Sequence, residues 1–139
     1  GNILAQKNLM KEITKYSSGV IWEEKVGYSR AVKFGDRILV SGTTAIVDGK
    51  LAGVGDAYLQ TVTIIKKISG VLQQAGSKLE DVVRVRVYLT DMSRFEEVAK
   101  AHGEFFREIK PAQTLIGISA LVDPEMLVEI EAEAVIPGE

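Results

Sequence analysis

The chain has 139 residues, the size of one ordinary domain, of which 46% are apolar and 26% charged. This balance is typical of a soluble globular protein and excludes a disordered or fibrous chain. The net charge of −2 provides no basic surface of the kind that DNA or RNA duplexes usually require. The sequence has no cysteine and one histidine, which excludes disulfide scaffolds, thiol nucleophiles, zinc clusters and multi-histidine metal sites.

No apolar run approaches the roughly 20 residues of a membrane-spanning helix. The start of the chain is too polar for a signal peptide, so we expect a cytoplasmic protein that contacts no membrane. No repeat or linker interrupts residues 1–139, which predicts a single domain. Residues 1–20 are expected to be a loose N-terminal segment.

The first patterned region predicts three short strands. Residues 29–34 and 37–43 are rich in β-branched and apolar side chains, and Gly35-Asp36 between them is typical of a tight hairpin turn. A third strand is expected over residues 44–47, followed by an Asp-Gly turn.

A long helix is predicted next. Asp56 is a favourable N-cap, and Gly76 is a typical C-terminal stop. Between them, apolar residues recur every three or four positions over about five turns. The predicted apolar face consists of Leu59, Val62, Ile65, Ile68, Leu72 and Ala75.

The second half of the chain predicts a strand, a helix and two more strands. Residues 82–89 alternate, with Val83, Val85, Val87 and Leu89 on one face and Arg84, Arg86 and Tyr88 on the other. Ser93 and Glu96 have the spacing of a capping box for a second helix. Its apolar stripe is Phe95, Val98, Ala99, His102, Phe105 and Phe106. The last strands are expected over residues 114–119 and 127–135.

The predicted order β-β-β-α-β-α-β-β is that of an α+β two-layer domain, in which two helices cover one face of a sheet. The other face would carry the arginines of residues 82–89 and the alternating glutamates of residues 127–135. If these strands are neighbours, the opposite charges form a favourable ladder across them. A face of this kind is either solvated or buried against another subunit.

An ordered set of short motifs resembles the RidA/YjgF family, the reactive-intermediate deaminases, which are also labelled L-PSP endoribonucleases. The motifs are Tyr28 followed by Ala31-Val32, Ile38 to Gly42, Gln74-Ala75-Gly76, Val83 to Asp91, Phe105-Phe106, Pro111-Ala112 with Thr114, and Val128 to Ala132. They occur in the family's order and span about residues 28–135.

The resemblance implies a chorismate-mutase-like fold with a mixed sheet, assembled as a homotrimer whose sheets face a central barrel. It also implies small-molecule sites at the subunit interfaces, where family members hydrolyse imines to 2-oxo acids and ammonia. In those members an arginine pairs with the substrate carboxylate through two hydrogen bonds, and a glutamate positions or activates water.

The family's site residues map onto this chain with two replacements. The glutamate corresponds to Glu129 and the tyrosine to Tyr28, but Thr43 stands in place of a glutamine and Gln113 in place of the arginine. Glutamine carries no charge and no guanidinium fork, so the resemblance predicts a member that lacks the deaminase arginine. Arg30 is the first candidate to replace it. The alternative, favoured from sequence alone, is that Arg30 is a surface cation at a strand edge.

These residues leave two functions open. In the first, the protein is a hydrolase of C–N bonds: Glu129 holds water, Gln113 and Thr43 bind an imino or oxo acid, and Tyr28 packs on it. In the second, the trimer holds a metabolite or a partner without chemistry. The endoribonuclease label is disfavoured, because the sequence has neither a basic patch with interleaved aromatics nor a histidine pair. No cofactor and no metal is predicted.

Four further signals are interpreted as structural. His102 lies on an apolar helix stripe and is expected to pack there. Gly53 and Gly55 precede a helix but lack the third glycine and the lysine of a phosphate loop. The alternating glutamates lie about 7 Å apart along one strand, too wide for a single metal ion. Trp22 is expected to be a packing anchor.

Overall fold

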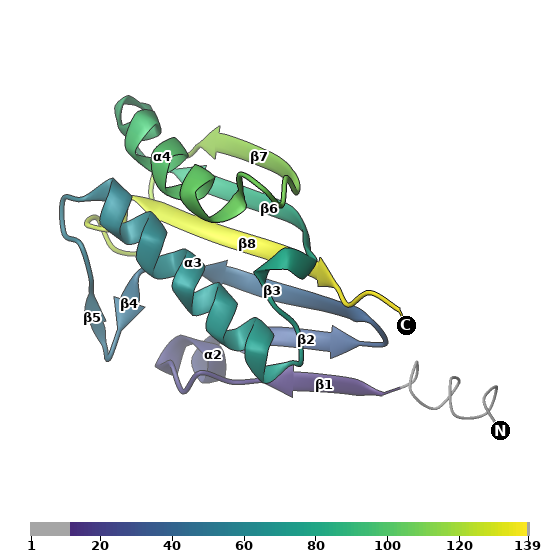
Figure 1. The fold of residues 1–139 in the computed structure, drawn as a ribbon. Helices are drawn as coiled ribbons and strands as arrows, with labels where there is room; N and C mark the ends of the chain where they lie inside the picture. The colour runs from purple at the N-terminus through teal and green to yellow at the C-terminus, as the bar shows by residue number, and fades with distance from the viewer. Residues whose placement is uncertain (1–11, 139) are drawn as a thin grey trace, which may run out of the picture.

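The computed structural model describes residues 12–138, in which two helices lie on one face of a sheet (Figure 1). The strands of this sheet are β1 (Ile13–Tyr16), β2 (Ala31–Phe34), β3 (Arg37–Thr43), β6 (Val82–Leu89), β7 (Ala112–Gly117) and β8 (Val128–Val135). The covering helices are α3 (Ala57–Gln74) and α4 (Phe95–Phe106). A short helix α2 (Ile21–Val26) and a small hairpin of β4 (Ile46–Val47) and β5 (Lys50–Leu51) complete the fold.

The main sheet has the order β1-β2-β3-β8-β6-β7. Its neighbours are antiparallel except for β6 and β7, which run parallel, so the predicted mixed sheet of an α+β domain is confirmed. No helix within residues 12–138 combines the length and apolar character that crossing a membrane requires.

Both predicted turns are present. Gly35 and Asp36 join Phe34 to its partner Arg37 in the β2–β3 hairpin. Asp48 and Gly49 both have positive φ, 52° and 79°, as a two-residue type I′ turn requires. The predicted strand 44–47 is reduced to Ile46–Val47, which pairs with β5 rather than with the main sheet.

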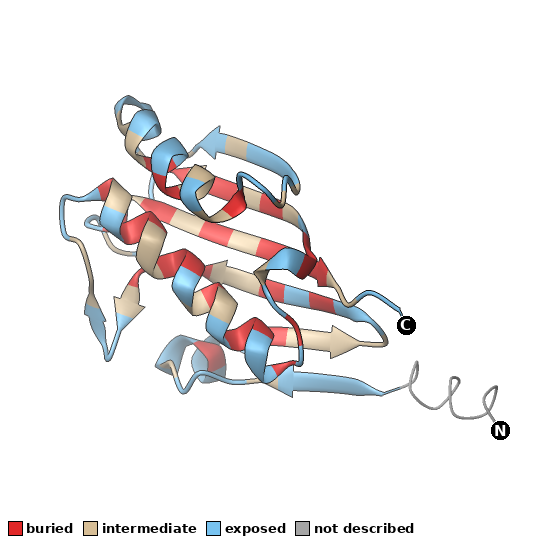
Figure 2. Cartoon of the chain, in the orientation of Figure 1, coloured by how far each residue is buried: buried red, intermediate tan, exposed pale blue. Residues whose placement is uncertain are grey.

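The prediction of a loose segment over residues 1–20 is wrong for its later part. Ile13–Tyr16 form β1, which pairs with β2, and α2 begins at Ile21. Residues 1–11 lie outside the described part of the chain. β1 leaves most of its side chains exposed along an edge of the sheet, so backbone pairing rather than an apolar pattern holds it in place (Figure 2).

Both ends of α3 were predicted correctly. The Asp56 carboxylate accepts a hydrogen bond from the backbone N–H of Leu59 at 2.9 Å. At the other end, Gly76 has φ +82°, and the backbone N–H of Ser77 returns to the carbonyl of Leu72 at 2.8 Å. This pattern is a Schellman cap, in which glycine takes the left-handed position at little steric cost.

The predicted apolar face of α3 is partly wrong. Leu59 is 42% exposed, whereas the neighbouring Gln60 is fully buried. The Gln60 side chain donates to the carbonyls of Gly53 and Glu125 and accepts from the N–H of Leu127, each at 2.9–3.0 Å. Because every polar atom of the amide has a partner, Gln60 takes an inward position that a hydropathy pattern assigns to leucine.

The predicted capping box of the second helix is also wrong. The residue before α4 is Arg94, which makes no side-chain cap. Asp91 instead caps the turn that precedes the helix, and its carboxylate accepts from the backbone N–H and the hydroxyl of Ser93 at 3.0 and 2.6 Å. A 3-10 turn over Met92–Arg94 then leads into α4. Phe95, the first predicted stripe residue, is 44% exposed at the start of α4. The buried positions of this helix are Val98, Ala101 and Phe106.

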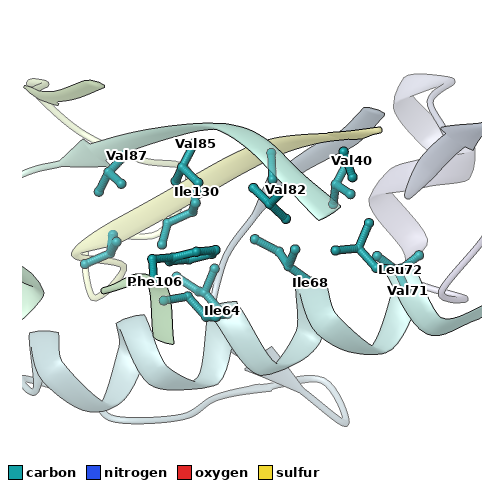
Figure 3. Packing of buried hydrophobic residues seen from close by; sticks show 14 of the residues in the cluster. Val40, Ile64, Ile68, Val71, Leu72, Val82, Val85, Val87, Phe106 and Ile130 are labelled. Carbon is teal, nitrogen blue, oxygen red and sulfur yellow. The ribbon is translucent and has the colours of Figure 1, made fainter. Parts of the chain in front are cut away.

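One hydrophobic core lies between the helices and the sheet (Figure 3). Ile64, Ile68 and Leu72 of α3 pack against Val40 and Ile130 of the central strands. Each large aliphatic side chain buried in this way contributes about 1.5–3 kcal/mol relative to an exposed one.

The opposite face of the sheet carries the predicted charge ladder. β6 and β8 are neighbours, and their register places Arg84 beside Glu133 and Arg86 beside Glu131. The ion-pair distances are 3.7 Å for Arg84–Glu133 and 3.5 Å for Arg86–Glu131. Val83 departs from the predicted alternation and is 48% exposed, because the β6–β8 register shifts between Val82 and Arg84.

Candidate functional site

The carboxylate of Glu129 lies against Gly42 at a β-bulge. β3 and β8 are adjacent, and their register shifts between Val40 and Thr43, so the backbone of Gly42 faces the Glu129 side chain. A Cβ added to Gly42 would overlap Glu129 Oε1 and would lie 3.0 Å from its Cδ. A glycine at residue 42 therefore makes room for the carboxyl group.

Burial raises the pKa of Glu129 above its ordinary value. The nearby charge of Arg30 opposes this rise, while the negative charge of Glu131 adds to it. A carboxyl group whose pKa is raised toward neutrality suits proton transfer in both directions.

Arg30 is a buried cation, so the interpretation favoured from sequence, a surface cation at a strand edge, is wrong. Its side chain is 8% exposed. One guanidinium nitrogen, Nη2, donates to the carbonyl of Gly42, and Cζ lies 5.8 Å from the centroid of the Tyr28 ring. The Nε of the same guanidinium is buried and has no hydrogen-bond partner within residues 12–138. Arg30 and Glu129 thus flank the same glycine.

Tyr28 and Thr43 lie close to this pair but differ in what they offer a ligand. Tyr28 is 37% exposed, and its ring contacts the Arg30 guanidinium. Thr43 is 1% exposed, and its hydroxyl donates to the carbonyl of Ser41 at 2.8 Å. The Thr43 hydroxyl therefore already has an internal partner, whereas the Tyr28 ring is accessible.

Gln113 lies at the opposite edge of the sheet from β1 and β2. It is an exposed residue of the edge strand β7, where it pairs with Val85 of β6. The strands β3, β8 and β6 separate β2 from β7, a span of about 19 Å at about 4.8 Å for each of four neighbouring pairs, and two such pairs, about 10 Å, separate β8 from β7. A single chain therefore brings Tyr28, Arg30, Thr43 and Glu129 together but leaves Gln113 apart.

Two charged residues near Arg30 were missed by the sequence analysis. Glu23 is 5% exposed, and its carboxylate accepts from the Ser17 hydroxyl and the Ser18 N–H, each at 3.0 Å. Burial raises the pKa of Glu23, but the hydrogen bonds from Ser18 and Ser17 and the charge of Arg30 outweigh this and lower it. No motif or spacing in the sequence marks Glu23.

The second missed residue is Lys67 of α3. Its ammonium donates to the carbonyl of Thr44 at 2.7 Å. Burial and the charge of Arg30 lower the pKa of Lys67 to about 8, with Glu23 acting in the opposite direction. Lys67 precedes the buried Ile68 on the helix, and the apolar pattern by itself gives no reason to single it out.

The structure assigns no part in the candidate site to the other residues that the sequence singled out. The His102 ring packs 4.7 Å from that of Phe106, and burial lowers its pKa, as expected for a packing histidine. Trp22 is 48% exposed, so its interpretation as a packing anchor is wrong. Gly53 and Gly55 both have positive φ, in keeping with a turn. Throughout the described chain, no three histidine or carboxylate side chains are grouped so that they could hold a metal ion.

The fold and this cluster define a two-layer α+β protein with a carboxyl group and a buried arginine beside one glycine. Known proteins share this arrangement of elements. The family described as Endoribonuclease L-PSP matches residues 11–136 of the chain. The chain therefore belongs to this family, the RidA/YjgF family that the sequence motifs resemble, and has its chorismate-mutase-like fold.

Individual relatives agree with this assignment. A solved structure of a YjgF/YER057c/UK114 family member from Mycobacterium tuberculosis has a TM-score of 0.82 and 42% identity, covering 90% of this chain and all of that one. An uncharacterized protein of Streptomyces coelicolor is 37% identical over 122 residues, which is 88% of this chain and 91% of the relative. A RutC family protein of Pyrococcus abyssi is 38% identical over 109 residues, covering 77% and 84% of the two chains.

Proposed function

We propose that this protein binds a small 2-imino or 2-oxo acid beside Glu129 and hydrolyses the C=N bond of the imine. The observation that carries the proposal is that Arg30 and Glu129 both lie against Gly42, the first at its carbonyl and the second at its Cα. A buried guanidinium with an unpartnered Nε offers the charge that Gln113 lacks. Arg30 would therefore hold the ligand carboxylate in place of the arginine found at the Gln113 position in the family's deaminases.

The chemistry assigned to Glu129 is proton transfer. Water attacks the imine carbon, and Glu129 takes a proton from it as the new C–O bond forms. The same carboxyl group returns this proton to the nitrogen, which gives the carbinolamine. Glu129 then takes the proton of the carbinolamine hydroxyl and delivers it to the amino nitrogen, so that the C–N bond breaks, ammonia leaves and the carbonyl forms. The raised pKa of Glu129 suits both steps, because the group has to accept and return a proton near neutral pH. Tyr28 would pack on the ligand through its exposed ring.

The complete site is proposed to require a second copy of the chain. Gln113 lies about four strand spacings from β2 on an exposed edge strand. The uncovered sheet face also exposes apolar side chains, including Leu39 at 41% and Ile116 at 45%. A homotrimer of the kind that the family resemblance implies would bring Gln113 of one copy toward Glu129 of another. Light scattering at several concentrations tests this, and a monomer at all concentrations would refute it.

An imine-hydrolysis assay tests the function. Iminobutanoate is generated in situ by a dehydratase, and the loss of the imine is followed with the parent protein and with Glu129→Gln, Arg30→Met and Gln113→Arg. We expect Glu129→Gln to lower the rate by about 10²–10⁴-fold, the usual contribution of a general acid–base group. Arg30→Met should raise the KM for the imine, whereas Arg107→Met, a change of an exposed arginine on the surface, should leave it unchanged.

Two other outcomes would lead to different functions. If the parent protein binds 2-oxobutanoate in calorimetry but does not hydrolyse the imine, the protein is a metabolite-binding protein. If Gln113→Arg then gains hydrolysis, the loss of that arginine explains the inactivity. The ribonuclease description of the family is tested by binding to single-stranded RNA at low salt. We expect none, because the net charge is −2 and one histidine cannot supply an acid–base pair.

A further inference from the structure

A hollow that includes two cationic side chains lies on the helix-covered side of the sheet. Its volume is about 220 Å³. The lining residues come from the segment before α2, from the ends of β2 and β3, and from α3: Ser17, Ser18, Arg30, Thr43, Lys67, Gly70, Val71 and Gln74. Arg30 and Thr43 of the candidate site line the hollow, whereas Glu129 and Gln113 do not contribute to it.

Two cations line the hollow, and each has hydrogen-bond donors without a partner among the described residues. Arg30 is more than nine-tenths buried, and its Nε has no partner within the described residues. The Lys67 ammonium has three donors, of which one is used by the carbonyl of Thr44. A buried donor without an acceptor costs free energy, and an acceptor that enters the hollow would recover it.

The charge at the hollow is not fully balanced by the protein. Glu23 is the acidic group whose charge acts on both Arg30 and Lys67. Its carboxylate is already held by Ser17 and Ser18 through three hydrogen bonds. One negative charge therefore faces two positive ones, and the mutual repulsion of Arg30 and Lys67 remains. The charges of Glu129 and Arg30 also interact, and this interaction lowers the pKa of Glu129. Glu129 is not among the charged groups that shift the pKa of Lys67.

We propose that this hollow is a binding site for a small oxyanion of the carboxylate or phosphate type, held by Arg30 and Lys67. An oxyanion supplies the acceptors that both cations lack and adds one negative charge between them. The hollow shares Arg30 with the proposed imine site but contains neither the proton-transfer residue nor Gln113, so Lys67 is the residue that distinguishes the two sites.

The test follows the backbone amide signals of Gly70 and Val71 by NMR, because both residues line the hollow. Sodium acetate and inorganic phosphate are titrated separately against sodium chloride at equal ionic strength. We expect saturable shifts with at least one of the two oxyanions and none with chloride. The anion that saturates at lower concentration identifies the ligand class as carboxylate or phosphate.

Variants on α3 decide whether Lys67 holds the anion. Lys67→Met keeps the apolar stem and removes the charge, and it should weaken binding by at least about tenfold, the value of one charge-assisted hydrogen bond. Lys66→Met removes an exposed neighbouring charge and should leave the affinity unchanged. Lys67→Arg should retain binding, which separates loss of the charge from loss of the fold.

Three results would overturn the proposal. These are the absence of saturable shifts with both oxyanions, equal weakening by Lys66→Met and Lys67→Met, or full binding in folded Lys67→Met. Glu129→Gln separates the two sites, because it should slow imine hydrolysis by about 10²–10⁴-fold while the shifts of Gly70 and Val71 persist. A parent protein that binds oxyanion at the hollow but hydrolyses no imine would refute only the proposed function.

Discussion

Gly42→Ala should separate catalysis from stability. Residue 42 is not among the positions with positive φ, so alanine fits its backbone conformation. The added Cβ would instead overlap Glu129 Oε1 and would lie 3.0 Å from Cδ of the same side chain. The group that has to move is the far end of a flexible side chain, so the overlap costs little folding energy but displaces the proposed proton-transfer group.

The size of the displacement follows from ordinary contact distances. Carbon atoms in contact lie about 3.5–4.0 Å apart, so Cδ of Glu129 has to retreat by roughly 0.5–1 Å. A misplacement of about 1 Å at a reacting group can lower a rate by about 10²-fold. The free energy of unfolding should change by less than about 1 kcal/mol, because the loss of chain entropy in the unfolded state partly offsets the steric cost.

The assay combines imine hydrolysis with chemical denaturation of the same samples. Gly103→Ala is the matched control, because its Cβ would meet the tip of another flexible side chain, Arg107 Nη2, at 3.1 Å. That variant should keep the parent rate. If Gly42→Ala hydrolyses the imine as fast as the parent, Glu129 is not the proton-transfer group, because proton transfer does not tolerate a displacement of this size.

Three further predictions concern stability. The pKa of Lys67 falls from 10.5 to about 8 on folding, so the unfolded chain holds the proton between these pH values and the folded chain does not. The free energy of unfolding should therefore rise with pH across this window, by about 1–2 kcal/mol after solvent screening, and Lys67→Met should remove the rise in urea titrations. Ile64→Ala, at a fully buried position, should cost about 2–5 kcal/mol in the same assay, against almost nothing for the exposed Val54→Ala. Arg86→Ala should cost less than about 1 kcal/mol, because Arg86 is 41% exposed beside Glu131, and a larger loss would indicate that another subunit buries this face.

Local features of the chain were predictable because neighbouring residues determine them. The β2–β3 hairpin, the caps of α3 and the inward valines of β6 depend on turn residues and on apolar spacing within a few positions. The charge ladder was also predictable. Arginines alternate with apolar residues on β6 and glutamates do so on β8, and opposite charges on neighbouring strands attract each other. The errors at Leu59 and Phe95 arose where polar side chains found partners in distant loops or in a 3-10 turn.

For the candidate site, the sequence suggested residues, and the tertiary structure decided the distances between them. The family motifs suggested Tyr28, Thr43, Gln113 and Glu129 as site candidates, and Arg30 was a further candidate that the sequence favoured as a surface cation. The distances among them depend on strand order, because β8 inserts between β3 and β6 and moves Gln113 to the far edge. The contact of Glu129 with Gly42 depends on a register shift between strands that are far apart in the chain.

The sequence by itself determined the family, the residue types available for chemistry and most of the elements in their order, but not β1, α2 or β5. Only the tertiary structure decided that Arg30 is buried beside Gly42, that Lys67 and Glu23 share its surroundings, and that β1 belongs to the sheet. The physical reason is that burial, charge environment and edge pairing depend on which distant segments meet. Local propensity and periodicity carry no information about those encounters.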